Sequence, residues 1–219
     1  MTKEEFLAKV EADPEWAPGW DIIDAEFERL YPGQKPSHYA TNLVARASLG
    51  GDEYLDGYSI YDSPKGYTHI VTYGMTELYA NEKRLGSEYN KWGYEMTMKL
   101  KADSAEDCLW ALDMLGNLAR YTYTTEKYFE PYQYISGGGN SLHQGEESAI
   151  TALLTVSDTE VMTQDTIYGK TEFIQLVGIT QQEFDAIRED IENVKILVER
   201  MKADNPDLVT DMSRTHSYL

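Results

Sequence analysis

Cysteine is almost absent from this chain, because Cys108 is the only one among 219 residues. A single cysteine excludes an intrachain disulfide and any metal site built from several thiolates. A lone thiol on a predicted helix is more often part of an apolar core than a nucleophile, so we interpret Cys108 as core packing. The four histidines lie in different segments without metal-ligand spacing. We therefore predict no metal site, and no motif indicates a cofactor.

Basic residues are also scarce. The chain has 19 Lys and Arg against 38 Asp and Glu, which gives a formal net charge of -19 and a pI near 4.5. Such a surface repels nucleic acid, so we expect no nucleic-acid partner. The same field accelerates encounter with a basic protein by about 10- to 1000-fold at low salt. The alternative interpretation is that the acidity only keeps the protein soluble.

Long apolar runs are missing too. The amino-terminal residues MTKEEFLAKVEADPEW carry acids throughout, so we predict no secretory signal, no membrane span and a cytoplasmic location. An apolar share of 42% in a chain of this length is enough for one sizeable core, which predicts a single domain over residues 1–219. Only five phenylalanines stand beside seventeen tyrosines, which suit half-buried sheet faces and protein interfaces.

The periodicity predicts helices separated by strands. Gly19–Tyr31 has the apolar spacing of a helix, and Ser104 with Asp107 resembles a capping box that opens a second helix reaching about Tyr123. Thr180 with Glu183 forms another capping box, ahead of one amphipathic helix that extends past Met201. The predicted strands are Tyr39–Leu49, Leu55–Tyr61, Tyr67–Tyr73, Trp92–Lys101, Thr151–Val156, Thr171–Ile179 and Leu208–Met212.

Two details of this pattern matter for the fold. Residues Tyr94 to Lys101 alternate between apolar and polar, which predicts one buried face and one solvent-exposed face. The glycine-rich stretch at residues 136–141 is predicted to be a mobile loop. No repeated βαβ unit is present, so the class is α+β, with a mixed, mostly antiparallel sheet packed with helices.

Motifs for catalysis are weak. Gly169-Lys170-Thr171 resembles the end of a phosphate-binding loop, but Gln164 occupies the position of its first glycine and a strand follows. No serine lies in a nucleophile-elbow pattern, and we predict no catalytic residue. An enzyme, either a hydrolase or a nucleotide-handling protein with a site of dispersed carboxylates and tyrosines, remains the alternative.

Seven sequence blocks in one order resemble the suppressor-of-fused family, and their common order favours a family relationship over chance. The blocks are PGWDIIDAEFERLYPGQ, LGGDEYLDGYSIY, HIVTYGMTELY, WGYEMTMKL, LGNLARYTY, GKTEFIQLVGIT and LVTDMSR. They look like the amino-terminal domain of the animal protein, which restrains Gli transcription factors in Hedgehog signalling. A single-domain chain of this kind resembles the bacterial branch, for which the implied role is an immunity protein that neutralises a polymorphic toxin.

The resemblance also implies binding residues. In the animal family a Gli peptide is gripped as an added β-strand, with contacts from an arginine-tyrosine pair that corresponds to Arg120 and Tyr121 here. Two acidic contacts of the family align with Gln133 and Val156, so Gli-type peptide binding is not expected. Arg120 and Tyr121 have the alternative role of capping and packing the end of the central helix.

The leading hypothesis is therefore a non-catalytic protein-binding domain of the immunity type. Its expected partner is a protein, and a basic toxin is one candidate. A self-associating structural module is a third hypothesis, and it requires an exposed apolar patch of several hundred Å².

Overall fold

The residues that this computed structural model describes, 1–41 and 55–219, contain five α-helices and eight β-strands. The helices are α1 (Lys3–Ala12), α2 (Pro18–Leu30), α4 (Leu109–Thr125), α5 (Gln181–Glu189) and α6 (Asn193–Asp204). The strands are β1 (Ser37–Ala40), β2 (Gly57–Ser63), β3 (Tyr67–Tyr73), β4 (Tyr89–Leu100), β5 (Tyr134–Ser136), β6 (Ile150–Ser157), β7 (Gln164–Thr166) and β8 (Gly169–Thr180).

The strands form one sheet in the order β1-β2-β3-β4-β8-β6-β5, and β7 pairs with β8 outside this order. The central pair, β4 with β8, is parallel, whereas the other pairs are antiparallel. This arrangement confirms the predicted α+β class with a mixed, mostly antiparallel sheet.

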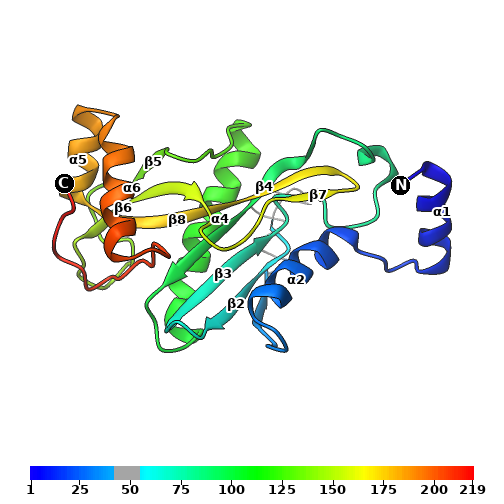
Figure 1. The fold of residues 1–219 in the computed structure, drawn as a ribbon, viewed down its shortest axis with the longest axis horizontal. Coiled ribbons are helices and arrows are strands. Elements are labelled where there is room, and N and C mark those ends of the chain that lie inside the picture. The colour runs from blue at the N-terminus through cyan, green and yellow to red at the C-terminus, as the bar shows by residue number, and fades with distance from the viewer. Residues whose placement is uncertain (42–54) are drawn as a thin grey trace.

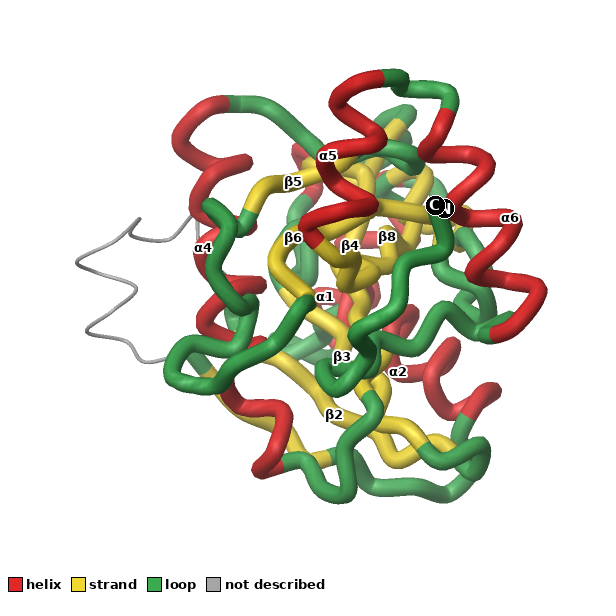
Figure 2. Tube along the Cα trace, turned by 90° about the vertical axis from the view of Figure 1, so that its left-hand side faces the viewer, coloured by secondary structure: helices red, strands yellow, loops and turns green. Residues whose placement is uncertain are grey.

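Helices cover both faces of the sheet. Helix α4 packs on one face, while α2, α5 and α6 pack on the other (Figures 1 and 2). The residues of β4 and β8 alternate between the two sides: Met96 and Leu176 join the cluster under α4, whereas Phe173 packs with α2 and Val177 with α5 and α6. Cys108 is fully buried in the α4 cluster, in agreement with its interpretation as core packing.

The prediction that one face of β4 is exposed to solvent is wrong. Glu95, Thr97 and Lys99 are fully buried with 0% exposure, and only Lys101 lies at the surface. These three side chains face the same side as α2. The segment after β6 contacts Thr97 through Asp158 and Lys99 through Thr159, whereas the turn after β3 encloses Glu95. The alternation was real, but it separated an apolar face from a buried polar face.

Four of the residues on this side form what we call the buried ion cluster: His69, Lys99, Asp158 and Glu160. The Asp158 carboxylate lies 3.0 Å from His69 Nε2 and 3.3 Å from Lys99 Nζ. Lys99 Nζ also lies 3.0 Å from Glu160 Oε2. Asp158 also accepts hydrogen bonds from the Thr97 hydroxyl at 2.6 Å and from the backbone N–H groups of Glu160 at 2.8 Å and Val161 at 3.0 Å. Since every charge has an opposite neighbour, the cluster tolerates burial.

A second buried carboxylate organises the turn after β3. Glu95 accepts hydrogen bonds from the backbone N–H groups of Gly74 at 3.0 Å and Thr76 at 2.9 Å, and from the Thr72 hydroxyl at 2.7 Å. Burial raises the pKa of Glu95, and these hydrogen bonds act in the opposite direction by favouring the charged form. The glutamate thus replaces water as the partner of a buried turn.

Several predicted boundaries also differ from the structure. The single helix predicted after Thr180 is divided into α5 and α6, and Ile191 between them is 56% exposed. The predicted strand Leu208–Met212 is reduced to one isolated parallel bridge between Leu100 and Thr210. Ser104 donates to the side chain of Asp107 instead of capping a helix, and α4 begins only at Leu109.

Other elements match or were missed. The capping box of Thr180 and Glu183 is confirmed. Helix α1 was not predicted, although Thr2 and Glu5 form a capping box at its start. Of the predicted strand Tyr39–Leu49, residues 42–49 lie outside the described part of the chain. The glycine-rich stretch forms a turn, with Gly138 and Gly139 at positive φ, beside a backbone hydrogen bond of 2.9 Å from Gly137 to Thr151.

We expect acid to destabilise the protein through the buried ion cluster. Burial favours a higher pKa for Asp158, but attraction to His69 and Lys99 holds its pKa well below the usual range. Burial also favours a higher pKa for Glu160, yet hydrogen bonds from Lys65, Tyr67 and Lys99 lower its pKa to about 2. Depressed carboxylate pKa values stabilise the fold above about pH 4, and this stability is lost as the pH falls toward 2.

Urea unfolding measured between pH 7 and pH 2 tests this expectation. Asp158→Asn should lower the free energy of unfolding at pH 7 by about 3 kcal/mol and flatten its decline in acid. The control Asp113→Asn removes an exposed carboxylate on α4 and should leave the acid profile unchanged. An Asp158→Asn profile parallel to that of the unmodified protein would contradict the assignment.

Candidate functional site

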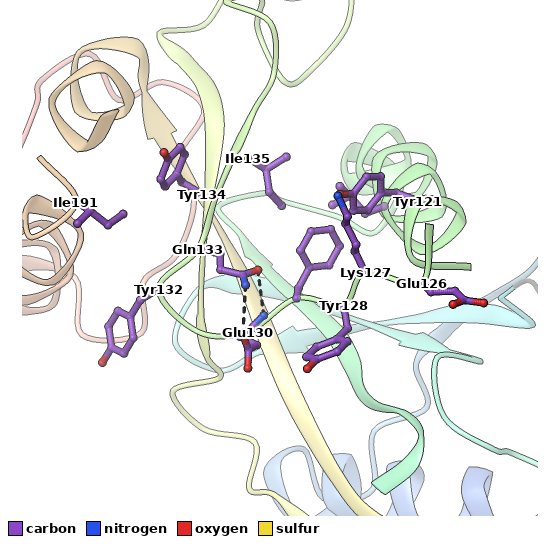
Figure 3. Close-up of a pocket in the computed structure, with 12 residues that line it drawn as sticks. Tyr121, Glu126, Lys127, Tyr128, Glu130, Tyr132, Gln133, Tyr134, Ile135 and Ile191 are labelled. Carbon is purple, nitrogen blue, oxygen red and sulfur yellow. Dashed lines mark hydrogen bonds between the residues drawn. The ribbon is translucent and has the colours of Figure 1, made fainter. Parts of the chain in front are cut away.

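A groove of about 780 Å³ opens where the end of α4 meets β5 (Figure 3). Most of its lining is aromatic or aliphatic, and we call it the tyrosine groove. These lining residues are Leu118, Tyr121, Tyr128, Phe129, Tyr132, Tyr134, Ile135 and Ile191. Its remaining residues are polar: Glu126, Lys127, Glu130 and Gln133. The groove combines apolar contact area with a charged margin.

The backbone between α4 and β5 is held in place at several points. Glu126 adopts a left-handed conformation that ends α4, and its N–H donates to Thr122 O at 2.9 Å. Further along, the N–H of Tyr132 donates to Thr155 O at 2.6 Å, and the N–H of Gln133 donates to Thr155 Oγ1 at 2.9 Å. Strand β6 therefore fixes the position of the groove.

Four tyrosine rings of the groove are partly exposed, and two of them pack on a neighbouring aromatic ring. Tyr121, Tyr128, Tyr132 and Tyr134 have between 38% and 56% of their surface exposed. Tyr121 stacks on Phe129 with ring centroids 5.9 Å apart, and Tyr134 meets Phe184 of α5 edge-on at 5.6 Å. Exposed rings with fixed positions provide contact area at low entropic cost, which is typical of binding surfaces.

Among the described strands, β5 is the last one at this end of the sheet. Thr155 N donates to Gln133 O and Gly137 N donates to Thr151 O, both at 2.9 Å. Because bonded positions alternate along an antiparallel pair, the backbone groups of Tyr134 and Ser136 are directed away from β6. The open edge of β5 thus presents donors and acceptors beside the tyrosine groove.

The structure brings two of the four predicted binding residues into the groove. Tyr121 and Gln133 line it, and the Gln133 side chain accepts a hydrogen bond from Glu130 N at 3.2 Å. Arg120 precedes Tyr121 on α4 but is not part of the lining. Val156 lies on β6 with 3% exposure and packs in the cluster under α5 and α6, so its side chain does not reach the groove.

The predicted alternative role in helix capping takes a different form. The carbonyl oxygen of Arg120 accepts from Thr124 Oγ1 at 2.8 Å, and that of Tyr121 accepts from Thr125 Oγ1 at 2.7 Å. The two threonine hydroxyls thus bond back to carbonyls one turn earlier in α4, while the Tyr121 ring packs on Phe129.

Sequence reasoning missed Tyr128, Tyr132 and Tyr134 as members of this surface. Their signal was a run of tyrosines at short spacing ahead of the glycine-rich stretch. Within residues 1–41 and 55–219, no group of three His, Cys, Asp or Glu side chains has the arrangement of a metal site. The same two ranges include no helix with the length and apolar character of a membrane span.

Comparison with known proteins identifies the family. A sequence model of the family described as Suppressor of fused protein (SUFU) matches residues 51–215, which is well over half of the chain. The chain belongs to the suppressor-of-fused family. The resemblance of the seven sequence blocks is thereby confirmed.

Two curated relatives match most of this suppressor-of-fused chain. The Suppressor of fused homologs of Homo sapiens and Mus musculus are each 28% identical to it over 213 residues. The alignments cover 90% of this chain but only 43% of each relative. The chain thus spans less than half the length of the curated relatives that it matches.

Solved structures share the suppressor-of-fused fold. A chain in the crystal structure of the Sufu–Fu complex has a TM-score of 0.77 and 24% identity, and the match covers 92% of this chain and 93% of that chain. The crystal structure of Drosophila Suppressor of Fused has a TM-score of 0.76 and 24% identity, and the match covers 92% of this chain and 51% of that chain. A suppressor-of-fused homologue from Neisseria gonorrhoeae has a TM-score of 0.60 and 13% identity, and the match covers 91% of this chain and 96% of that chain.

Proline substitutions along β5 test the direction of its backbone groups. Ile135→Pro removes an N–H directed at β6 and should lower the free energy of unfolding by about 1 to 3 kcal/mol. Ser136→Pro removes an N–H on the open side, so its cost should stay below about 1 kcal/mol. Chemical denaturation measures both, and equal losses would contradict the proposed register of the open edge.

Proposed function

We propose that this protein is a non-catalytic, protein-binding domain of the suppressor-of-fused type that acts in the cytoplasm as a bacterial immunity protein. Its partner is a basic polymorphic toxin, which it neutralises by occlusion. We further propose that residues 1–219 work as a single domain. The observation that carries the proposal is the open edge of β5 beside the tyrosine groove.

The open edge supports binding by strand addition. A partner segment in extended conformation can pair with the outward backbone groups of Tyr134 and Ser136, which gives affinity without sequence preference. Its alternate side chains would then contact the two sides of β5. Tyr132, Tyr134 and Ile191 lie on one side in Figure 3, and Tyr121 lies on the other. These contacts supply the specificity.

Charge supports a basic partner. The net charge of -19 attracts cations at long range. At short range the groove carries Glu126 and Glu130 against one cation, Lys127. A lysine or arginine of the partner can therefore approach both carboxylates and tyrosine ring faces.

Gli-type recognition is not part of this proposal. The two family positions with acidic contacts hold Gln133 and Val156 here, and Val156 is buried. In the solved Sufu–Fu complex, Fu is the partner of that family member, which supports protein binding as the common mode. We propose the mode for this chain, with a different partner.

The enzyme alternative gains no support from the buried ion cluster. The side chains of His69, Lys99 and Asp158 are fully buried, so a substrate cannot reach them, and none of them lines the tyrosine groove. The Lys99 ammonium is paired with the Asp158 carboxylate, and His69 is hydrogen-bonded to the same carboxylate. We therefore interpret the cluster as structural.

A pull-down from host lysate, with the variants Tyr121→Ser and Ser136→Pro, tests the proposal. The unmodified protein should retain one basic protein, and each variant should retain about tenfold less of it. The control Tyr89→Ser removes a tyrosine of similar exposure, 49%, at the start of β4 outside the groove, and it should bind normally. Capture that is equal for all four proteins would contradict the site.

Salt should slow the binding of the basic partner. We expect its association rate constant to fall at least about tenfold between 20 and 500 mM salt, because exposed charges are screened beyond about 8 Å at physiological ionic strength. Stopped-flow mixing with the captured partner measures the rate. A rate that does not depend on salt would remove the electrostatic part of the proposal.

A further inference from the structure

One buried carboxylate connects the carboxy-terminal segment with α5. Glu183 has a side chain with 0% exposure, and its Oε2 accepts from Thr180 N at 2.7 Å to complete the capping box of α5. Arg214 donates to both of its oxygens, from Nη1 at 2.7 Å and from Nη2 at 3.0 Å. The Tyr218 N–H donates to Oε1 at 2.9 Å. The same group thus begins a helix and binds residues far along the chain.

Arg214 is itself held in this position. Its Nη2 donates to Gly178 O of β8 at 3.1 Å, and its Nη1 donates to His216 O at 2.8 Å. The guanidinium lies 5.2 Å from the ring of Tyr218, which packs against the cluster under α5 and α6. Arg214 has only 8% of its side chain exposed, so its charge depends on Glu183 for compensation.

Helix α5 adjoins the tyrosine groove, although none of its own residues lines it. Its Phe184, the residue after Glu183, meets Tyr134 of β5 edge-on at 5.6 Å. Ile191, directly beyond the end of α5, lines the groove with 56% exposure. A change in the position of α5 therefore reaches both the open edge and the groove.

We propose that the Arg214–Glu183 pair is a latch by which the carboxy-terminal segment, residues 208–219, sets the position of α5 and so the shape of the tyrosine groove. Arg214 is a positioning residue in this scheme. The regulatory part rests on the proposed function, since it takes the groove as the partner site. Releasing the segment frees α5 to move, and the groove then loses its pre-formed shape.

The bonding pattern favours a latch over a simple surface tether. Bidentate contact between guanidinium and carboxylate fixes orientation as well as distance. Loss of Arg214 would leave Glu183 charged and buried with fewer donors, and the local remedy is solvent entry between α5 and the segment. Residues 217–219 also bind α6, where Arg200 Nη1 donates to Tyr218 O at 2.7 Å and the Tyr218 hydroxyl donates to Asp204 at 2.9 Å. Apart from the contacts with Glu183, their bond to α5, Gln182 Nε2 to Leu219 O at 3.4 Å, is exposed and long.

Hydrogen–deuterium exchange of the full chain tests the latch without any partner. Arg214→Gln should accelerate amide exchange about tenfold or more in residues 181–192 and 132–137, while β3 and β4 keep their rates. Arg214→Lys retains the charge but loses the bidentate geometry, so its effect should be intermediate. The control Lys101→Gln breaks an exposed pair with Asp211 of the same segment and should change neither region.

A double variant keeps the test valid if Arg214→Gln is too unstable. Glu183→Gln/Arg214→Gln removes the uncompensated charge and retains an acceptor for the capping box, so it should restore global stability but not slow exchange in residues 181–192. Faster exchange confined to residues 208–219, or a uniform acceleration that includes β3 and β4, would overturn the latch.

Binding of the captured basic partner separates the latch from the proposed function. Arg214→Gln should raise the partner's Kd about tenfold, mainly through faster dissociation. If exchange changes as expected but the Kd does not, the latch exists and the groove is not the partner site, which overturns the regulatory part. If Tyr121→Ser weakens binding and Arg214→Gln does not alter exchange, the proposed function stands and the latch is wrong.

Discussion

The buried ion cluster is the constraint on which the architecture depends. Lys99 and His69 come from neighbouring strands, and the carboxylates of Asp158 and Glu160 come from the chain that leaves β6. Isolated charges in a protein interior would be strongly unfavourable. The segment that follows β6 must therefore pass over β3 and β4 where Lys99 and His69 lie. The cluster thereby fixes one face of the sheet, between the apolar contacts of α2 and those of α5 and α6.

The candidate binding site lies at the β5 edge of the sheet, away from the buried ion cluster. Its edge strand β5 has only three residues and one neighbour, β6, in the strand order. A short edge strand limits uncontrolled aggregation, and it still offers a template for one chosen partner. Around it, tyrosines combine apolar area with hydroxyl groups that tolerate water, and acidic residues add a preference for cations. In the proposed binding mode, the edge backbone, the tyrosine rings and the acidic residues would contact the same partner segment.

The sequence predicted the elements well where a local signal was sufficient. Thr180 and Glu183, which lie three positions apart, indicated the start of α5 through their capping box. Most strands were predicted from their composition. It failed where the outcome depended on distant residues. The polar face of β4 was predicted to be solvent-exposed because alternation alone does not reveal the partners that Asp158 and Glu160 provide. Likewise, the heptad-like spacing across Ile191 did not show that α5 ends at Glu189.

The sequence by itself determined the family, the fold class and the acidity, and it predicted four binding candidates, Arg120, Tyr121, Gln133 and Val156, because ordered motifs and composition are properties of the linear chain. Only the tertiary structure decided which tyrosines share a surface, that β5 leaves one side of its backbone open, and that Val156 is buried. It also brought Arg214 to Glu183, 31 residues away in sequence. Burial and pairing arise from contacts between residues distant in the chain, and local periodicity carries no record of those contacts.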